Sequence, residues 1–292
     1  MTESPSSTAS AQRRDQPLVL VSGLRKVFGE PETPDAIVAV DNVSFEIHGE
    51  ETFGLVGESG SGKSTIARTL LRLEEASAGS LIVVGINVRT AAGNDLRRLR
   101  RTVQMVFQDP ISSLNPRQNV STLISGPLRA HRIGSRTSQR ERVRDVAQLV
   151  GLAKRHLDRR PRELSGGECQ RVAIARSIVI EPRLIVLDEA VTALDLSMRS
   201  QILNLLRDLQ SRLGLSYLFI SHDLAVVRYM SDRIGVMQQG KIVETASRDA
   251  LFDAPSNEYT QELLAAVLEP PRPEKRRRID SPAPLDAQRQ AN

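Results

Sequence analysis

The sequence predicts an α/β protein with a mixed or parallel sheet and a helical insert in the middle of the chain. Short apolar runs with β-branched residues alternate with helical patterns along most of the 292 residues. Such continuous runs are typical of strands that are buried on both faces of a sheet. In addition, a glycine-rich turn directly follows one run and precedes a helical segment. Together these observations favour a large α/β domain around a central sheet.

The expected strands are short, and each is bounded by turn-forming or polar residues. Taken along the chain, they cover residues 19–24, 44–47, 52–56, 80–84, 103–107, 184–187, 217–220 and 234–237.

The pattern between residues 110 and 182 is mostly helical. Val143, Val146, Ala147 and Val150 recur at helical spacing within residues 138–150, and Gly151 follows as a stop signal. Residues 165–168 have the Ser-x-x-Glu spacing of a capping box and precede an apolar helix. We therefore expect a helical subdomain over about residues 110–180.

The two ends of the chain differ in composition from this domain, which we place at residues 17–268. Residues 1–16 are rich in Ser and Thr without an apolar core, and are predicted to be a disordered leader rather than a secretory signal. Residues 269–292 are rich in proline and basic, and are also predicted to be disordered. This tail could meet nucleic acid or an anionic membrane, although a solvated terminus is the simpler interpretation.

Composition excludes several classes of protein. Hydrophobic residues make up 40% and charged residues 26%, which is ordinary for a soluble globular protein. The single cysteine, Cys169, rules out a disulfide framework within the chain and a cysteine-based zinc site. Aromatic residues are only 3% and tryptophan is absent, which disfavours a surface for stacking nucleic-acid bases. A nucleic-acid partner is therefore not expected.

Residues 57–65 carry the strongest functional signal. They read Gly-Glu-Ser-Gly-Ser-Gly-Lys-Ser-Thr and match G-x-x-x-x-G-K-[ST], between an expected strand and a helix over residues 66–73. Glycines let successive backbone amides face a phosphate, and the helix N-terminus adds further donors. Lysine supplies charge for the β- and γ-phosphates, and the following serine supplies a hydroxyl for Mg²⁺. The expected nucleotide contacts are Gly57, Glu58, Ser59, Gly60, Ser61, Gly62, Lys63, Ser64 and Thr65.

A pair of carboxylates completes this prediction. Four apolar residues, 184–187, lead into Asp188 and Glu189. Asp188 at a strand end beside the phosphate loop is expected to hold Mg²⁺ through water, and Glu189 to act as general base on the attacking water. Neighbouring side chains on an extended chain point to opposite sides. Asp188 can therefore hold the metal while Glu189 acts on water.

Residues 164–171, Leu-Ser-Gly-Gly-Glu-Cys-Gln-Arg, resemble the signature sequence of the ATP-binding cassette (ABC) ATPases. The resemblance covers roughly residues 18–268. It implies the fold of a P-loop NTPase with a mixed sheet, an antiparallel β-subdomain and a helical insert. It also implies that ATP lies between the phosphate loop of one chain and the signature of another. The residues it assigns to this signature contact are Ser165, Gly166, Gly167 and Glu168.

The same resemblance assigns roles outside these motifs. Gln108 matches the Q-loop glutamine and would join Ser64 and Asp188 at Mg²⁺. His222 matches the switch histidine, so the implied catalytic set is Glu189, His222 and Gln108. Asp195 matches the D-loop, and Phe28 lies where the family places an aromatic ring under adenine.

Four segments narrow the resemblance to the peptide/nickel importer group, and within it to the F-type ATPase of oligopeptide and dipeptide permeases. They are residues 58–59, 64–73, 108–117 and 257–264. Two departures are visible: Glu-Ala-Val-Thr at 189–192 replaces the commoner Glu-Pro-Thr-Ser, and the tail has no cysteine. The catalytic carboxylate is kept, so hydrolysis is expected to survive.

The implied protein is a peripheral ATPase subunit on the cytoplasmic face of the inner membrane, using ATP and Mg²⁺. Its implied partners are a sister ATPase of the D-type or a second copy, two transmembrane permease subunits and, indirectly, an extracytoplasmic substrate-binding protein. The alternative is a non-transport ABC ATPase that acts on nucleic acid or ribosomes, favoured by the basic tail alone. The transported substrate, the choice of homodimer or heterodimer and the role of the tail stay open.

Overall fold

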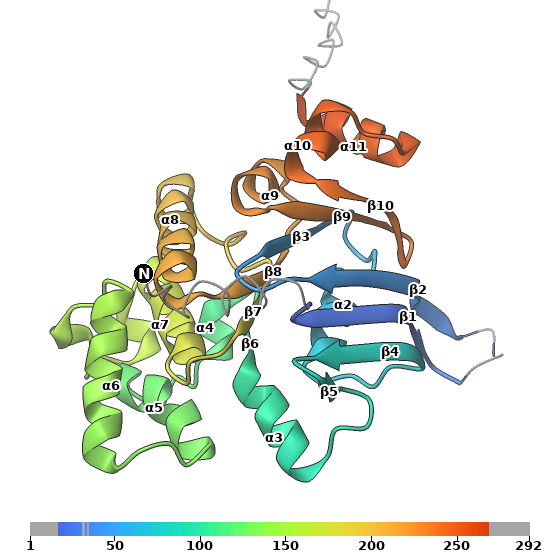
Figure 1. Ribbon diagram of the computed structural model, residues 1–292. Coiled ribbons are helices and arrows are strands. Elements are labelled where there is room, and N and C mark those ends of the chain that lie inside the picture. The colour runs from blue at the N-terminus through green and yellow to red at the C-terminus, as the bar shows by residue number, and fades with distance from the viewer. Residues whose placement is uncertain (1–16, 31–32, 34, 269–292) are drawn as a thin grey trace, which may run out of the picture.

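The computed structural model describes residues 17–30, 33 and 35–268 (Figure 1). The predictions of a disordered leader at 1–16 and a disordered tail at 269–292 lie outside these residues.

The core is a six-stranded sheet with the order β10-β9-β3-β8-β7-β6. Its strands pair in parallel, except that β10 runs antiparallel to β9 at one edge. The sheet is therefore mixed, as predicted. Its strands are β3 (Thr52–Val56), β6 (Val103–Val106), β7 (Leu184–Asp188), β8 (Ser216–Ile220), β9 (Arg233–Gln238) and β10 (Lys241–Ser247).

A second, antiparallel sheet has the order β2-β1-β4-β5. Its strands are β1 (Val19–Phe28), β2 (Ile37–Ile47), β4 (Ala78–Val83) and β5 (Ile86–Asn87). Three of the expected strands, at residues 19–24, 44–47 and 80–84, belong to this sheet and not to the core sheet. The first part of β1 alternates between buried and exposed residues, as is usual for a sheet with one solvated face.

Four helices form the insert after β6 and lie at one end of the molecule in Figure 1. They are α4 (Pro110–Ser113), α5 (Val120–Ala130), α6 (Arg136–Leu149) and α7 (Gly166–Ile178), with the short 3₁₀ turns η1 (Lys154–His156) and η2 (Pro161–Glu163) between the last two. The helix expected at 138–150 is α6, which Ser135 caps by accepting a hydrogen bond from the Ser138 amide.

The remaining described helices connect the strands. They are α2 (Lys63–Leu70), α3 (Gly93–Thr102), α8 (Leu196–Leu213), α9 (Leu224–Met230), α10 (Arg248–Asp253) and α11 (Glu258–Leu268). The helix expected at 66–73 begins earlier, at Lys63, and ends before Arg72, whose φ of +52° cannot continue a helix.

Two apolar clusters lie on opposite faces of the core sheet. Along β7, Leu184 and Val186 pack with the antiparallel sheet and α2, whereas Ile185 and Leu187 pack with the helical insert and α8. A strand that contributes to both clusters must be apolar at every position, which explains the continuous run in the sequence.

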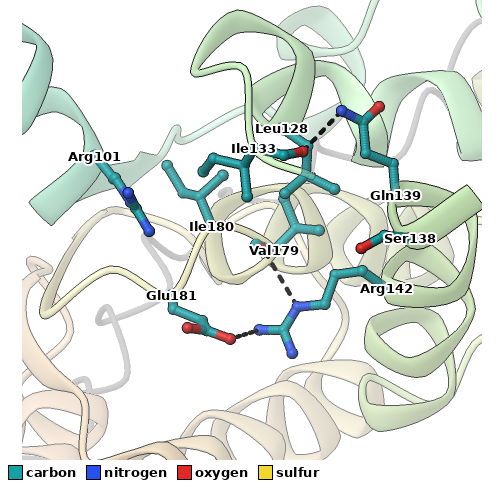
Figure 2. Close-up of a pocket in the computed structure, with 9 residues that line it drawn as sticks. All are labelled: Arg101, Leu128, Ile133, Ser138, Gln139, Arg142, Val179, Ile180 and Glu181. Atoms are coloured by element: carbon teal, nitrogen blue, oxygen red, sulfur yellow. Dashed lines mark hydrogen bonds and ion pairs between the residues drawn. The ribbon is translucent and has the colours of Figure 1, made fainter. Parts of the chain in front are cut away.

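A pocket of about 210 Å³ opens near the amino ends of β6 and β7 (Figure 2). Arg142 spans it, with Nη2 2.7 Å from Glu181 Oε1 and Nε 3.3 Å from the Val179 carbonyl oxygen. Asp188, expected to hold Mg²⁺, and Glu189, expected to be catalytic, lie at the opposite, carboxyl end of β7, so this pocket is separate from their site. Among the described helices, none has both the length and the apolar character needed to cross a membrane.

Candidate active site

The phosphate loop joins β3 to α2 and needs glycine for two distinct reasons. Gly57, Gly60 and Gly62 have φ of +151°, +82° and +103°, which side-chain-bearing residues rarely adopt. A Cβ at Gly57 would also lie 2.1 Å from the Met237 carbonyl oxygen, and one at Gly62 would lie 2.2 Å from that of Ala39. The loop is thus held against β9 and β2 at distances that only glycine allows.

Lys63, the first residue of α2, turns its side chain back into the loop. Its Nζ donates to the carbonyl oxygens of Gly57 at 2.8 Å and Glu58 at 2.6 Å, and lies 3.1 Å from Ser61 Oγ. Burial lowers the pKa of Lys63, while the carboxylates of Glu189 and Asp188 oppose that shift. The ammonium group therefore lies within the loop that is expected to bind phosphates, and Glu58, Ser59 and Gly60 form the loop's exposed outer side.

Ser64 and Asp188 form a second part of the site. Ser64 Oγ donates to Asp188 Oδ1 at 2.9 Å, and Asp188 is only 6% exposed. Burial raises the pKa of Asp188, and the Ser64 hydroxyl opposes this rise. A hydroxyl beside a buried carboxylate is a set of hard oxygen donors that fits Mg²⁺. No cluster of three or more His, Cys, Asp or Glu that could hold a metal occurs among the described residues, so phosphate and water oxygens would complete the coordination.

Glu189 lies one residue further along and is held from two sides. Gln108 Nε2 donates to Glu189 Oε2 at 2.8 Å, and His222 Nδ1 lies 3.3 Å from Glu189 Oε1. These partners follow β6 and β8, which flank β7 in the sheet, so the three residues meet at the carboxyl edge.

The backbone of Glu189 has a φ of +49°, which is unusual for a residue with a side chain. Its carbonyl oxygen accepts hydrogen bonds from the Thr192 amide at 3.2 Å and the Thr192 hydroxyl at 2.7 Å. Thr192 belongs to the unusual Glu-Ala-Val-Thr segment, and it closes the turn that presents the carboxylate. No motif in the sequence indicated this role for Thr192.

The signature loop leads into α7 with the capping box that the sequence predicted. Ser165 Oγ accepts from the Glu168 amide at 3.3 Å, and Glu168 Oε2 accepts from the Ser165 amide at 2.8 Å. A Cβ at Gly167 would lie 2.7 Å from Met198 Sδ, so α8 packs tightly against the signature.

Asp195 caps α8 by accepting a hydrogen bond from the Met198 amide at 2.9 Å. One turn later, Arg199 Nη1 lies 3.0 Å from Oδ2 of Asp223, the residue that caps α9. The D-loop is thereby linked to the segment of His222. No motif in the sequence indicated this contact of Arg199, although its partner Asp223 directly follows His222.

Phe28 is 37% exposed at the end of β1, and Lys26 Nζ lies 4.6 Å from the centroid of its ring. It pairs with Ile37 on β2, two residues from Ala39, whose carbonyl oxygen faces the phosphate loop. An adenine contact at Phe28 stays a prediction.

Hydrogen bonds, and the charge interactions of Lys63 with Asp188 and Glu189, therefore connect one group of residues: Lys63, Ser64, Asp188, Glu189, Gln108 and His222. The signature and Asp195 form a separate group. Among the described residues, no hydrogen bond or ion pair joins the signature to the phosphate loop.

A phosphate loop follows the central strand β3, and a buried Asp and the next Glu lie at the carboxyl end of β7, on the far side of β8 from β3. This arrangement is typical of nucleotide-hydrolysing P-loop ATPases. Residues 40–192 match the family model described as "ABC transporter". The chain belongs to the ABC transporter family, and it is an ABC-type ATPase.

The names of proteins with similar sequences are consistent with membership of the ABC transporter family. The chain is 45% identical over 263 residues to the "Oligopeptide transport ATP-binding protein OppF" of Streptococcus mutans, covering 90% of this chain and 85% of that protein. It is 50% identical over 229 residues to the "Glutathione import ATP-binding protein GsiA" of Salmonella choleraesuis, covering 78% of this chain but 37% of that longer protein.

A solved structure is also similar. The dimeric post-hydrolysis state of the ATP-binding cassette MJ0796 bound to ADP and Pi matches with a TM-score of 0.71 and 28% identity, covering 79% of this chain and 98% of that one.

Proposed function

We propose that this chain is the nucleotide-binding subunit that powers an ABC importer for peptides or related small solutes. The observation that carries the proposal is the Glu189 carboxylate, held by Gln108 and His222 at the strand edge that also bears the phosphate loop. The similar proteins from Streptococcus mutans and Salmonella, whose names specify oligopeptide transport and glutathione import, support the class of solute.

The residues divide the chemistry between them. Lys63 and the loop amides bind the β- and γ-phosphates of ATP. Ser64, Asp188 and Gln108 would hold Mg²⁺, which supplies charge neutralisation at the transferred phosphate. Glu189 accepts a proton from the attacking water, His222 stabilises the charge near the γ-phosphate, and Phe28 stacks on the adenine.

A complete site requires two chains. Gly166 and Gly167 at the start of α7 offer backbone amides suited to a phosphate, yet no hydrogen bond or ion pair joins their signature to the phosphate loop of the same chain. The second chain is a D-type sister ATPase or another copy, placed head to tail. The dimeric state of the MJ0796 cassette supports this arrangement.

Two membrane permease subunits complete the transporter, which places the chain peripherally on the cytoplasmic face of the inner membrane. Gln108 lies between β6 and α4, where the core meets the helical insert. A permease segment docked beside Gln108 would act on Glu189 through the 2.8 Å hydrogen bond between the two side chains. A substrate-binding protein outside the membrane would select the solute.

Replacing Glu189 with Gln tests the catalytic assignment. The amide cannot accept a proton from water, so we expect ATP turnover to fall about a hundredfold or more while ATP binding persists. Glu141→Gln on the exposed face of α6 is the matched control and should leave turnover unchanged. Turnover in the Glu189 variant equal to that of the unaltered chain would contradict the role.

The Glu189→Gln chain also tests the transport assignment, because a trapped ATP-bound assembly should survive purification. Solubilised native membranes, treated with ATP and Mg²⁺, should yield two permease subunits and a sister ATPase with this chain. Recovery of nucleic acid or ribosomes without a permease would overturn the proposal.

A further inference from the structure

A buried histidine lies beside the signature helix and has no place in the chemistry described above. His156 ends η1, its side chain is 8% exposed, and its Nε2 lies 3.3 Å from Glu168 Oε1. Its other ring nitrogen, Nδ1, is buried and has no hydrogen-bond partner in the described part of the chain. An unpartnered buried nitrogen costs stability, and an apolar side chain of similar size would avoid that cost.

The partner of His156 is the glutamate of the capping box. Glu168 Oε2 accepts hydrogen bonds from the Ser165 amide at 2.8 Å and from the Ser165 hydroxyl at 2.9 Å, while Oε1 faces His156. The Ser165 amide lowers the pKa of Glu168 most strongly, and the Ser165 hydroxyl and His156 lower it further against the effect of burial. The carboxylate is therefore charged and engaged on both oxygens.

This arrangement matters for the two glycines between Ser165 and Glu168. Within the described residues, the amides of Gly166 and Gly167 donate no hydrogen bond. A carboxylate at a helix N-terminus is drawn to free amides in the same way as a phosphate. A Glu168 side chain that was free to turn would compete with a phosphate for them.

We infer that His156 is a positioning residue that holds the Glu168 carboxylate on the Ser165 side and so keeps the Gly166 and Gly167 amides open for the γ-phosphate. This inference rests on the proposed function, in which the signature of one chain binds ATP held by another. His156 acts through Glu168 and does not itself touch the nucleotide.

The test compares His156→Leu, which removes the donor, with His156→Gln, whose amide N–H reaches a position similar to that of Nε2. For the full-length chain in its ATP-hydrolysing assembly, we expect His156→Leu to lower kcat roughly tenfold and to weaken ATP-dependent association. The affinity of the unassociated chain for ATP should not change, because the phosphate loop is intact. His156→Gln should restore most of the turnover.

Thermal unfolding separates positioning from a merely structural role. Since Leu removes the unpartnered Nδ1, we expect the Tm of His156→Leu to equal or exceed that of the unaltered chain while its turnover falls. His131→Leu, in the same insert at the end of α5, is the matched control and should leave turnover unchanged.

Two results would overturn the inference: normal turnover in His156→Leu, or a loss of turnover accompanied by a lower Tm that His156→Gln does not reverse. A failure of the proposed function would look different, because the unaltered chain would then show no ATP turnover or ATP-dependent association.

Discussion

Asp188 and Glu189 are neighbours in the chain, but the structure gives them opposite environments. Asp188 ends β7, is 6% exposed and accepts a hydrogen bond from the Ser64 hydroxyl. Glu189 leaves the strand with a φ of +49° and extends between Gln108 and His222. The change in backbone direction separates a carboxylate suited to a metal from one suited to water.

Burial of Asp188 predicts a stability gain when its charge is removed. Burial raises the pKa of Asp188 in the folded chain. Its charged form therefore costs stability, and this cost grows as the pH rises above the ordinary aspartate value of about 3.9. Asp188→Asn keeps an acceptor for Ser64, so the nucleotide-free variant should have a higher Tm at pH 7 and no Mg²⁺-dependent hydrolysis.

The check is thermal unfolding without nucleotide between pH 4.5 and pH 7.5. The gain in Tm should shrink toward the acidic end, because the raised pKa of Asp188 favours protonation of the folded chain there, and the proton removes the buried charge. Asp208→Asn on the exposed side of α8 serves as the control and should give a smaller, flatter difference. A lower Tm for Asp188→Asn at pH 7 would refute the electrostatic cost.

At the scale of elements, the N-terminus of α7 carries a capping box and is also the segment proposed to bind the γ-phosphate. Ser165 and Glu168 satisfy each other's backbone amides, as a capping box does in any helix. The same turn carries Gly166 and Gly167, and Gly167 lies so close to Met198 that a Cβ there would be 2.7 Å from its sulfur. The close packing of α8 therefore fixes the direction in which the glycine amides point.

Removing the caps of two helices distinguishes the stabilising role of the α7 N-terminus from its proposed role in ATP hydrolysis. Ser165→Ala removes the cap of α7 and Ser135→Ala removes the cap of α6. Each should lower the free energy of unfolding by about 1 kcal/mol. Denaturant unfolding measures that loss, and ATP hydrolysis should fall only for Ser165→Ala. Equal turnover of the two variants would mean that the α7 cap has no role beyond stability.

At the scale of the whole molecule, the helical insert carries a net positive charge, and the other described residues together carry a net negative charge. Residues 110–180 contain 14 Arg and Lys against five Asp and Glu, a net charge of +9. The other described residues contain 18 basic and 23 acidic side chains, a net charge of −5. In the proposed head-to-tail pair, we expect the net positive charge of one chain's insert to attract the net negative charge of its partner's remaining residues during association.

This division of charge predicts that ATP-driven association slows as salt is added. With Glu189→Gln at saturating ATP, the association rate measured by light scattering should fall severalfold between about 0.05 M and 0.5 M KCl, because salt screens the attraction. Reversing charge with Arg140→Glu and Arg144→Glu, two cations of α6 without a described ion-pair partner, should slow association and flatten its salt dependence. A rate that rises with salt would contradict the electrostatic attraction.

The sequence by itself determined the class of fold, the phosphate loop, the strand-terminal carboxylates and the capping box of α7. These features depend on local spacing: a strand, a glycine turn and a helix follow one another within a few residues, as do Ser165 and Glu168. Gln108 and His222 also follow short apolar runs, but resemblance to the ABC ATPases, and not their spacing, assigned them to the site.

Only the tertiary structure decided which distant groups meet. The apolar runs alone did not show that residues 19–24, 44–47 and 80–84 form a separate sheet, because strand pairing is a long-range property. Thr192, Arg199 and His156 likewise escaped notice, since their contacts with Glu189, Asp223 and Glu168 depend on how turns and helices pack. A pattern along the chain reports local geometry, whereas the partner of each side chain is fixed by the packing of elements remote in sequence.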